Sequence, residues 1–234
     1  MSVSGVINTH FIVAYMLMQH GTEEQKQRWL PGVAAGEILL AIGMTEPSGG
    51  SDLAALKTTA VRDGDHYVVN GAKTWITNAP IADVFIVYAK TKPEAGARGI
   101  SAFIVERGFE GLTTSQTFHK MGNRGSPTGQ IFFENCRVPA ENLMGVENMG
   151  IAIVMGGLDI ERTVFSSLAL GQARRAMELA VRYAHERTQF GKPIARFQLI
   201  QAKIADMYTQ LEACLLYTSP SPRDQRGSRM PASG

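Results

Sequence analysis

The stretch of sequence that decides the fold is residues 58–77, TTAVRDGDHYVVNGAKTWIT. Two runs rich in β-branched and aromatic residues flank Asp63-Gly64-Asp65, and an Asp-Gly turn between such runs is typical of a β-hairpin. Asn70-Gly71 marks a second tight turn before a further strand at residues 73–77. The stretch therefore predicts antiparallel strands near the middle of the chain.

Short apolar runs continue this pattern on both sides of the stretch. Each run is bounded by residues that favour turns, so that we expect further strands at residues 38–44, 84–89, 100–106, 111–119 and 130–133. Their close spacing predicts a barrel or a pair of packed sheets.

Helical periodicity flanks the predicted strands at both ends. Apolar residues recur three and four positions apart at residues 8–18, 150–190 and 197–214. Thr22 and Gln25 have the spacing of a capping box for a short second helix, which we expect to end at Pro31. Because helices and strands are segregated along the chain, the pattern predicts an α+β fold and not alternating βαβ units.

These patterns divide the chain into four segments. Residues 1–37 are helical, residues 38–140 form a β domain and residues 141–214 are helical again. Residues 215–234 combine proline, serine and arginine with no apolar face to bury, and they resemble a non-native tail. An authentic disordered basic tail is the alternative.

Composition excludes several classes of function. Of 234 residues, 44% are hydrophobic and 19% are charged, and the net charge of +2 arises from charges spread along the chain. No basic stripe for nucleic acid, no apolar run that could span a bilayer and no dinucleotide or P-loop glycine motif is found in the sequence. Cys136, Cys214 and the five histidines lack the spacing of metal ligands. We therefore expect no nucleic acid, no membrane span and no metal.

A first candidate site is the segment MTEPSGGSD at residues 44–52. It ends a predicted buried strand with small residues, which let a backbone approach a ligand and expose amide and hydroxyl donors. A plain turn is the alternative.

A second candidate pairs Trp75 with Thr77. The period of a strand places both on one side, so that an indole surface lies beside a hydroxyl donor and suits a flat polar ring system. The alternative is a core tryptophan beside a solvated threonine.

A third candidate is Glu161, which lies in an apolar helical stretch between Leu158 and Val164. A carboxylate that faces an apolar cavity could remove a proton beside a thioester carbonyl. The alternative is an exposed glutamate paired with Arg162 or Arg187.

Taken together, these motifs resemble the acyl-CoA dehydrogenases over nearly the whole chain to about Cys214. The resemblance rests on MTEP at 44–47 with GSD at 50–52, WITN at 75–78, Arg187, FG at 190–191 and FQ at 197–198. Within this family, DIER at 159–162, GNRGS at 122–126 and KIADMY at 203–208 look most like the isovaleryl branch.

The resemblance implies a fragment of the acyl-CoA dehydrogenase fold. A β-barrel-like middle domain would lie between the end of an amino-terminal helical domain and part of a carboxy-terminal helical bundle. The implied reaction removes two hydrogens across the α,β bond of a short or branched-chain acyl-CoA, such as isovaleryl-CoA, and gives the trans-2-enoyl-CoA. FAD would be the cofactor, an electron-transfer flavoprotein the acceptor, and the full-length protein a homotetramer in a bacterial cytoplasm or a mitochondrial matrix.

The resemblance also assigns residues. Glu161 would be the catalytic base, because the isovaleryl and long-chain branches carry the base on this helix. The FAD ring system would be surrounded by Ile42, Gly43, Met44, Thr45, Ser51, Trp75, Ile76 and Thr77. Arg187 and Gln198 would serve the pyrophosphate and adenosine end of the FAD held by a neighbouring subunit. The CoA thioester would be lined by Ser51, Asp159, Ile160, Glu161 and Arg162.

Three alternatives remain open at this point. The chain could belong to a dehydrogenase for another acyl chain, to a related oxidase that passes electrons to oxygen, or to a non-catalytic module that only binds partners.

Overall fold

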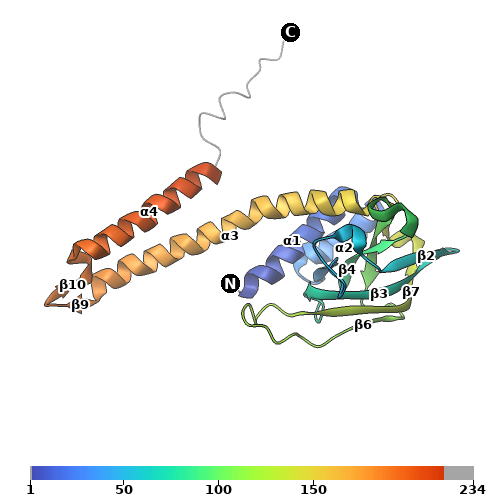
Figure 1. Cartoon of the computed structure of the whole chain (residues 1–234), viewed down its shortest axis with the longest axis horizontal. Helices are drawn as coiled ribbons and strands as arrows, with labels where there is room; N and C mark the ends of the chain where they lie inside the picture. Colours follow the sequence, from blue (N-terminus) through green and yellow to red (C-terminus); the bar gives the residue numbers. More distant parts are fainter. Residues whose placement is uncertain (1, 219–234) are drawn as a thin grey trace, which may run out of the picture. The chain divides into compact units, whose positions relative to one another are not determined.

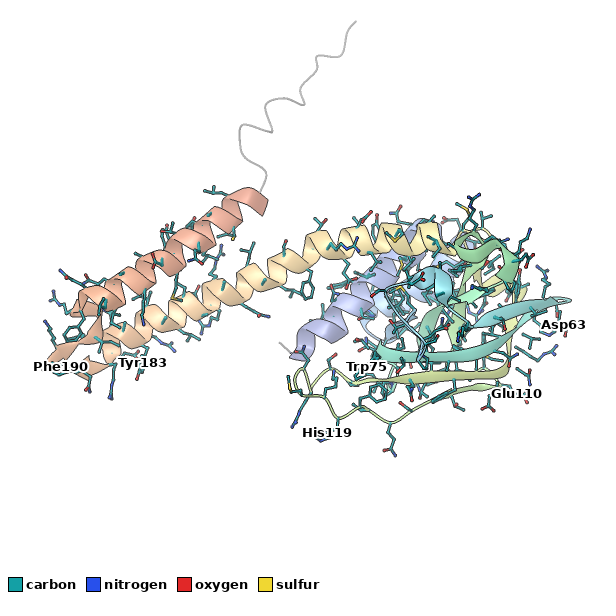
Figure 2. All side chains as sticks on the ribbon, viewed as in Figure 1. Asp63, Trp75, Glu110, His119, Tyr183 and Phe190 are labelled. Carbon is teal, nitrogen blue, oxygen red and sulfur yellow. The ribbon has the colours of Figure 1, made fainter. Side chains whose placement is uncertain are left out.

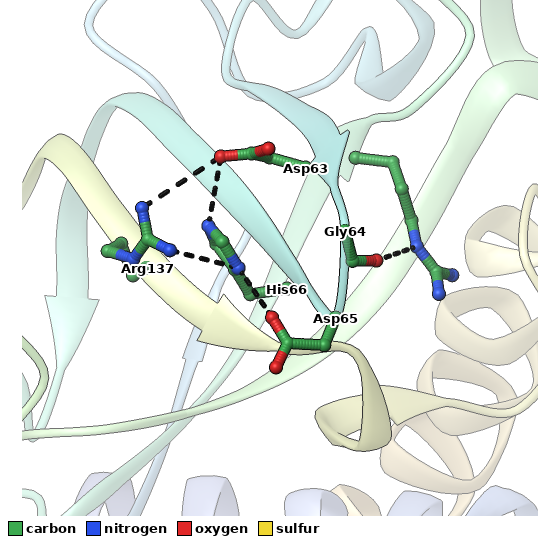
Figure 3. A network of polar contacts seen from close by, with 6 residues as sticks. Asp63, Gly64, Asp65, His66 and Arg137 are labelled. Atoms are coloured by element: carbon green, nitrogen blue, oxygen red, sulfur yellow. Dashed lines mark hydrogen bonds and ion pairs between the residues drawn. The ribbon is translucent and has the colours of Figure 1, made fainter.

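The Asp-Gly stretch forms a β-hairpin, as the sequence predicts. In the computed structural model, which describes residues 2–218, β2 (Thr59–Asp63) pairs antiparallel with β3 (His66–Thr77). Polar contacts surround the turn, since the His66 ring lies 3.2 Å from a carboxylate oxygen of Asp63 and 2.9 Å from one of Asp65 (Figure 3). Arg137 joins this network through a 3.1 Å contact with Nδ1 of His66.

β3 continues through Asn70 and Gly71, so the turn predicted there is wrong. Pairing with β7 (Thr128–Pro139) shifts its register between Val69 and Gly71, and the φ of Gly71 is 145°. A Cβ at Gly71 would lie 2.5 Å from Oγ1 of Thr58. The Asn-Gly pair therefore makes a bulge within one long strand, because glycine is needed where the two backbones approach closely.

The strands form one sheet with the order β6-β7-β3-β2-β4-β5-β8, and β1 pairs parallel with β4. The other strands of this sheet are β1 (Leu40–Gly43), β4 (Val84–Lys90), β5 (Ile100–Glu106), β6 (Leu112–Thr114) and β8 (Leu143–Met144). Within the described residues β6 and β8 are the two ends of this order and do not pair with each other, so the predicted barrel is not closed. The sheet instead buries side chains on both of its faces.

One face of the sheet is covered by helices. Ile86 and Tyr88 of β4 pack with Met16 of α1 (Ser2–His20) and Trp29 of α2 (Glu23–Ala35), together with Ile153 near the start of α3 (Gly150–Glu186). The alternate residues of β4 and β5, including Phe85 and Phe103, face a second cluster that contains residues of β3 and β7. This mixture of helices on a largely antiparallel sheet confirms the α+β fold class (Figure 1).

The ends of α2 illustrate what local sequence predicts well and badly. The predicted capping box is confirmed, since Thr22 and Gln25 exchange hydrogen bonds of 3.1 and 3.2 Å. Pro31 does not end the helix but lies inside it, and the helix ends before Gly36 at a φ of 75°. Proline removes one backbone donor, whereas the left-handed glycine cap supplies N–H bonds to the carbonyls of the last turn.

The chain separates into two compact units, Met1–Glu161 and Arg162–Gly234. The second unit holds the rest of α3, a small hairpin of β9 (Thr188–Gln189) and β10 (Lys192–Pro193), and α4 (Gln198–Thr218). α3 ends earlier and α4 later than the sequence pattern predicts, and residues 219–234 of the predicted tail lie outside the described residues.

The short 3-10 helices are Leu53–Ala55, Pro93–Gly99, Ala140–Asn142 and Ile194–Arg196. None of the described helices combines the length and apolar character needed to cross a membrane.

Candidate active site

A small, mainly apolar pocket in the first unit contains the predicted base. Its volume is about 30 Å³, and it lies between α1, β1 and the first turns of α3. The lining residues are Thr9, Ile12, Met16, Ile42, Met44, Val154, Leu158 and Glu161. Three residues that the sequence singled out, Ile42, Met44 and Glu161, are therefore brought together.

Glu161 is half-buried at this pocket and is its one ionisable lining residue. Its Oε1 accepts a 2.6 Å hydrogen bond from Nδ2 of Asn8. Leu158 and Glu161 share one face of α3, whereas Asp159 and Ile160 are exposed and do not line the pocket. The arrangement places a carboxylate oxygen beside apolar side chains, as proton removal from carbon requires.

Gly157 allows α3 to approach α1 at the pocket. A Cβ at Gly157 would lie 2.7 Å from Sδ of Met16, which is fully buried. The Tyr88 hydroxyl donates a 3.4 Å hydrogen bond to the same sulfur. The Gly156-Gly157 pair thus leaves α3 unbroken and provides a close contact between two helices.

A buried ion pair fixes the segment that follows β1. Nζ of Lys73 in β3 lies 2.8 Å from Oε1 of Glu46, and the two side chains are 0% and 4% exposed. Burial alone would raise the pKa of Glu46, but hydrogen bonds from Lys73 and Thr58 and the charge of Lys73 hold it below the usual 4.5. Burial lowers the pKa of Lys73 to about 8, although Glu46 opposes this effect.

The ion pair holds the predicted cofactor segment against β3. The Lys73 ammonium donates to the carbonyl of Met44 at 3.3 Å, and the backbone N–H of Thr74 donates to the carbonyl of Thr45 at 2.9 Å. The Glu46–Lys73 pair is not among the predicted site features. Lys73 is the first residue of the strand predicted at 73–77 and is followed by Thr74, so local sequence gives no signal for a buried lysine.

Trp75 is exposed, so the core-tryptophan alternative is wrong. The register of β3 against β7 shifts between Lys73 and Ile76, and Trp75 adopts a φ of 59°, which is rare for a bulky residue. Its side chain is 62% exposed, while that of Ile76 is 3% exposed. Such strained positions cluster at ligand sites, and this one turns an indole ring away from the core.

Thr77 connects this indole surface with the pocket through α1. The side chain of Thr77 is half-buried, and a Cβ at Gly5 would lie 3.9 Å from its methyl group. Gly5 precedes Thr9 by about one helical turn, roughly 6 Å along the axis. The Trp75–Thr77 segment and the Glu161 pocket therefore lie along the same part of α1.

The second unit contains a wider pocket of about 740 Å³ around the β9–β10 hairpin. Its lining residues are Gln189, Phe190, Lys192, Ile194, Arg196, Phe197, Gln198, Leu199 and Ile200. Phe190 is 91% exposed and lies at the hairpin end of this unit (Figure 2). Lys192 and Arg196 lie with the exposed Phe190 and the half-buried Phe197 in this lining, a combination that suits a ligand with an anionic group and a flat base.

Of the two residues predicted for this region, Gln198 lines the pocket and Arg187 does not. Arg187 instead connects α3 to the hairpin, because its carbonyl accepts a 2.8 Å hydrogen bond from the N–H of Ile194. Lys192 and Arg196 also line this pocket and are not among the predicted residues, although both lie between the FG and FQ motifs.

Family models match the chain in three consecutive segments. The N-terminal, middle and C-terminal domains of acyl-CoA dehydrogenase match residues 1–37, 41–136 and 148–220. The chain belongs to the acyl-CoA dehydrogenase family.

Curated relatives of this acyl-CoA dehydrogenase chain differ in the substrate that they are named for. The chain is 48% identical over 203 residues to mitochondrial isovaleryl-CoA dehydrogenase of Pongo abelii, covering 86% of this chain and 48% of the relative. It is also 48% identical over 203 residues to cyclohex-1-ene-1-carbonyl-CoA dehydrogenase of Geobacter metallireducens, covering 86% of this chain and 53% of the relative. The chain thus spans about half the length of the curated relatives it matches.

A solved structure of the family has the same fold. The acyl-CoA dehydrogenase of Geobacillus kaustophilus matches with a TM-score of 0.83 at 42% identity, over 88% of this chain and 55% of that one.

The first unit offers a surface of the chemical kind that a flavin ring requires. The exposed Trp75 indole on its strained bulge offers a flat surface in the first unit, next to the half-buried Thr77 hydroxyl. The other positions predicted to contact the cofactor or substrate differ in their exposure to solvent. Gly43 and Ile76 are buried and present mainly backbone, Thr45 is half-buried, and Ser51 and Arg162 are exposed.

Proposed function

We propose that this chain contributes to the FAD-dependent α,β-dehydrogenation of a short or branched-chain acyl-CoA to the trans-2-enoyl-CoA. The observation that carries the proposal is the apolar pocket with a single carboxylate, that of Glu161. A carbon acid needs a base whose oxygen meets a C–H bond away from bulk water, and the apolar lining around Glu161 supports that role.

In this proposal, different residues of the chain have different roles. Glu161 takes the pro-R proton from the carbon next to the thioester carbonyl. Ser51, Asp159, Ile160 and Arg162 would line the CoA thioester. The ring system of FAD would be held by Ile42, Gly43, Met44, Thr45, Ser51, Trp75, Ile76 and Thr77. Arg187 and Gln198 would serve the pyrophosphate and adenosine end of the FAD of a neighbouring subunit. FAD, when bound, supplies the acceptor for the hydride that leaves the β carbon.

The lining of the pocket supports an apolar acyl group. Met16 and Leu158 are among the apolar side chains that bound it. We propose isovaleryl-CoA as the substrate, in agreement with the isovaleryl-CoA dehydrogenase relative. The cyclohex-1-ene-1-carbonyl-CoA dehydrogenase relative makes the cyclic thioester the comparison substrate.

The partners follow from the same proposal. Electrons would pass to an electron-transfer flavoprotein, and the full-length protein would be a homotetramer, as the family resemblance implies. Its location would be the mitochondrial matrix in a eukaryote, in line with the mitochondrial relatives, or the cytoplasm in a bacterium.

Anaerobic flavin bleaching tests this function. The chain is loaded with FAD and mixed with isovaleryl-CoA, butyryl-CoA or cyclohex-1-ene-1-carbonyl-CoA, and the loss of flavin absorbance is followed. We expect bleaching by the wild type and none by Glu161→Gln with FAD still bound, while Glu147→Gln, which removes an exposed carboxylate outside the pocket, bleaches normally. Undiminished bleaching by Glu161→Gln would remove this residue from the base role, and a wild type that binds FAD but never bleaches would refute the function.

A further inference from the structure

Asn8 of α1 and Glu161 of α3 form a side-chain hydrogen bond across 153 positions of sequence. The distance between Nδ2 of Asn8 and Oε1 of Glu161 is 2.6 Å, and both side chains are half-buried. Among the described residues, Asn8 is the one that bonds to this carboxylate. The bond is short even for a hydrogen bond to an ionised group.

The chemistry of the two groups gives the bond a direction. A carboxylate has only acceptor sites, so the amide must present its NH₂ group and not its oxygen. Because the bond occupies Oε1, the proton from a substrate would arrive at Oε2. A neutral amide thereby fixes the rotation of the carboxylate without adding a charge to an apolar pocket.

Asn8 is held on a rigid element. Asn8, Ile12 and Met16 are spaced four residues apart and share one face of α1, which also lines the pocket. The His10 ring ties the same helix to its neighbours, through contacts of 3.1 Å with the carbonyl of Val33 and 3.4 Å with the N–H of Leu40. The position of the amide is therefore set by the packing of α1 and not by a loop.

We propose that Asn8 is the positioning residue of Glu161: its amide holds the carboxylate in the rotamer in which Oε2 faces the α carbon of the acyl-CoA. The proposal rests on the proposed function, since it assigns Glu161 as the base. It adds a residue of the amino-terminal helix, outside all the motifs of the sequence analysis, to the machinery of the site.

The amide also suits both protonation states of the base. When Glu161 is ionised, Asn8 donates from Nδ2. With the proton on Oε2, Oε1 is the carbonyl oxygen of a neutral carboxyl group and still accepts from Nδ2. The same hydrogen bond can therefore persist before and after proton transfer.

The test combines a spectroscopic and a kinetic measurement on the full chain. Glutamate labelled with ¹³C at Cδ is incorporated, and the Glu161 signal is identified by its loss in Glu161→Gln. Asn8→Leu, an apolar side chain of similar size, removes the donor, and Asn8→Ala serves if Asn8→Leu does not fold. Gln19→Leu is the matched control, because it replaces an exposed amide on the same helix.

We expect Asn8→Leu to shift the Glu161 signal and to leave the other glutamate signals in place. Gln19→Leu should shift neither the Glu161 signal nor the other glutamate signals. In the FAD-loaded chain, the limiting rate of bleaching at saturating isovaleryl-CoA should fall about 10- to 100-fold with the half-saturating concentration unchanged, as expected for a misplaced catalytic group.

Two results would overturn the proposal directly. An unmoved Glu161 signal in Asn8→Leu would show that the bond does not form in solution, and a shifted signal with an unchanged limiting rate would show that it does not position the base. A wild type that holds FAD without bleaching would refute the proposed function, and the positioning role with it. The labelled signal distinguishes this failure from loss of the bond itself.

Discussion

Replacing Lys73 with methionine should destabilise the first unit strongly. The substitution keeps an unbranched side chain but removes the ammonium group that lies 2.8 Å from the Glu46 carboxylate and 3.3 Å from the Met44 carbonyl. Glu46 is only 4% exposed, so its charge would stay buried without a cation. Removing one partner of such a pair costs about 3–5 kcal/mol.

This cost can be measured by thermal unfolding. For a chain of this length each kcal/mol lowers Tm by roughly 2–4 °C, so Lys73→Met should lower Tm by roughly 6–20 °C in circular dichroism. The double variant Lys73→Met with Glu46→Gln should recover part of the loss, because no charge then remains buried. The control is Lys26→Met, which breaks the exposed 2.8 Å pair with Glu23 and should change the stability by less than about 1 kcal/mol.

Equal small effects of Lys73→Met and Lys26→Met would contradict the predicted cost of an unpaired charge at Glu46. A double variant less stable than Lys73→Met would also contradict it, because the loss would then come from packing and not from an uncompensated charge.

Two further predictions concern pH and helix packing. The folded pKa of Glu46 lies below its usual 4.5, so the Glu46 carboxyl group binds fewer protons in the folded state than in the unfolded state. The contribution of Glu46 to the free energy of unfolding is therefore complete above about pH 4.5 and is lost as the pH falls through the folded pKa. Acid titration of the unfolding midpoint should show this loss, and Glu46→Gln should flatten the curve; an equal slope in both would contradict the assignment. Gly157→Ala places a Cβ 2.7 Å from Sδ of Met16, so overpacking should cost about 1–3 kcal/mol in denaturant unfolding, whereas Gly156→Ala, where a Cβ meets open space, should cost nothing. Equal stability of the two glycine variants would argue against the close helix contact.

Much of the fold follows from local sequence. The Asp-Gly hairpin, the capping box of Thr22 and the long helix before the β9–β10 hairpin were all predicted from spacing alone. The errors occur where a tertiary contact decides the outcome. Asn70-Gly71 has the signature of a turn, yet Thr58 packs against Gly71 and a bulge forms instead.

The candidate site was only partly predictable for the same reason. Glu161, Ile42 and Met44 were identified from motifs, and the structure brings them to one pocket. Asn8 lies 153 positions from its partner, and Met16 and Gly157 meet only when α1 packs on α3. Local sequence periodicity cannot predict such pairs, because their contacts form only when distant segments of the chain pack together.

The ends of the sheet carry a consequence for the behaviour of the protein in concentrated solution. At the two ends of the strand order, an incoming strand from another molecule would find three residues of β6 or two of β8 to pair with. Such short edge strands offer few backbone donors and acceptors, which disfavours pairing between folded molecules at these two ends.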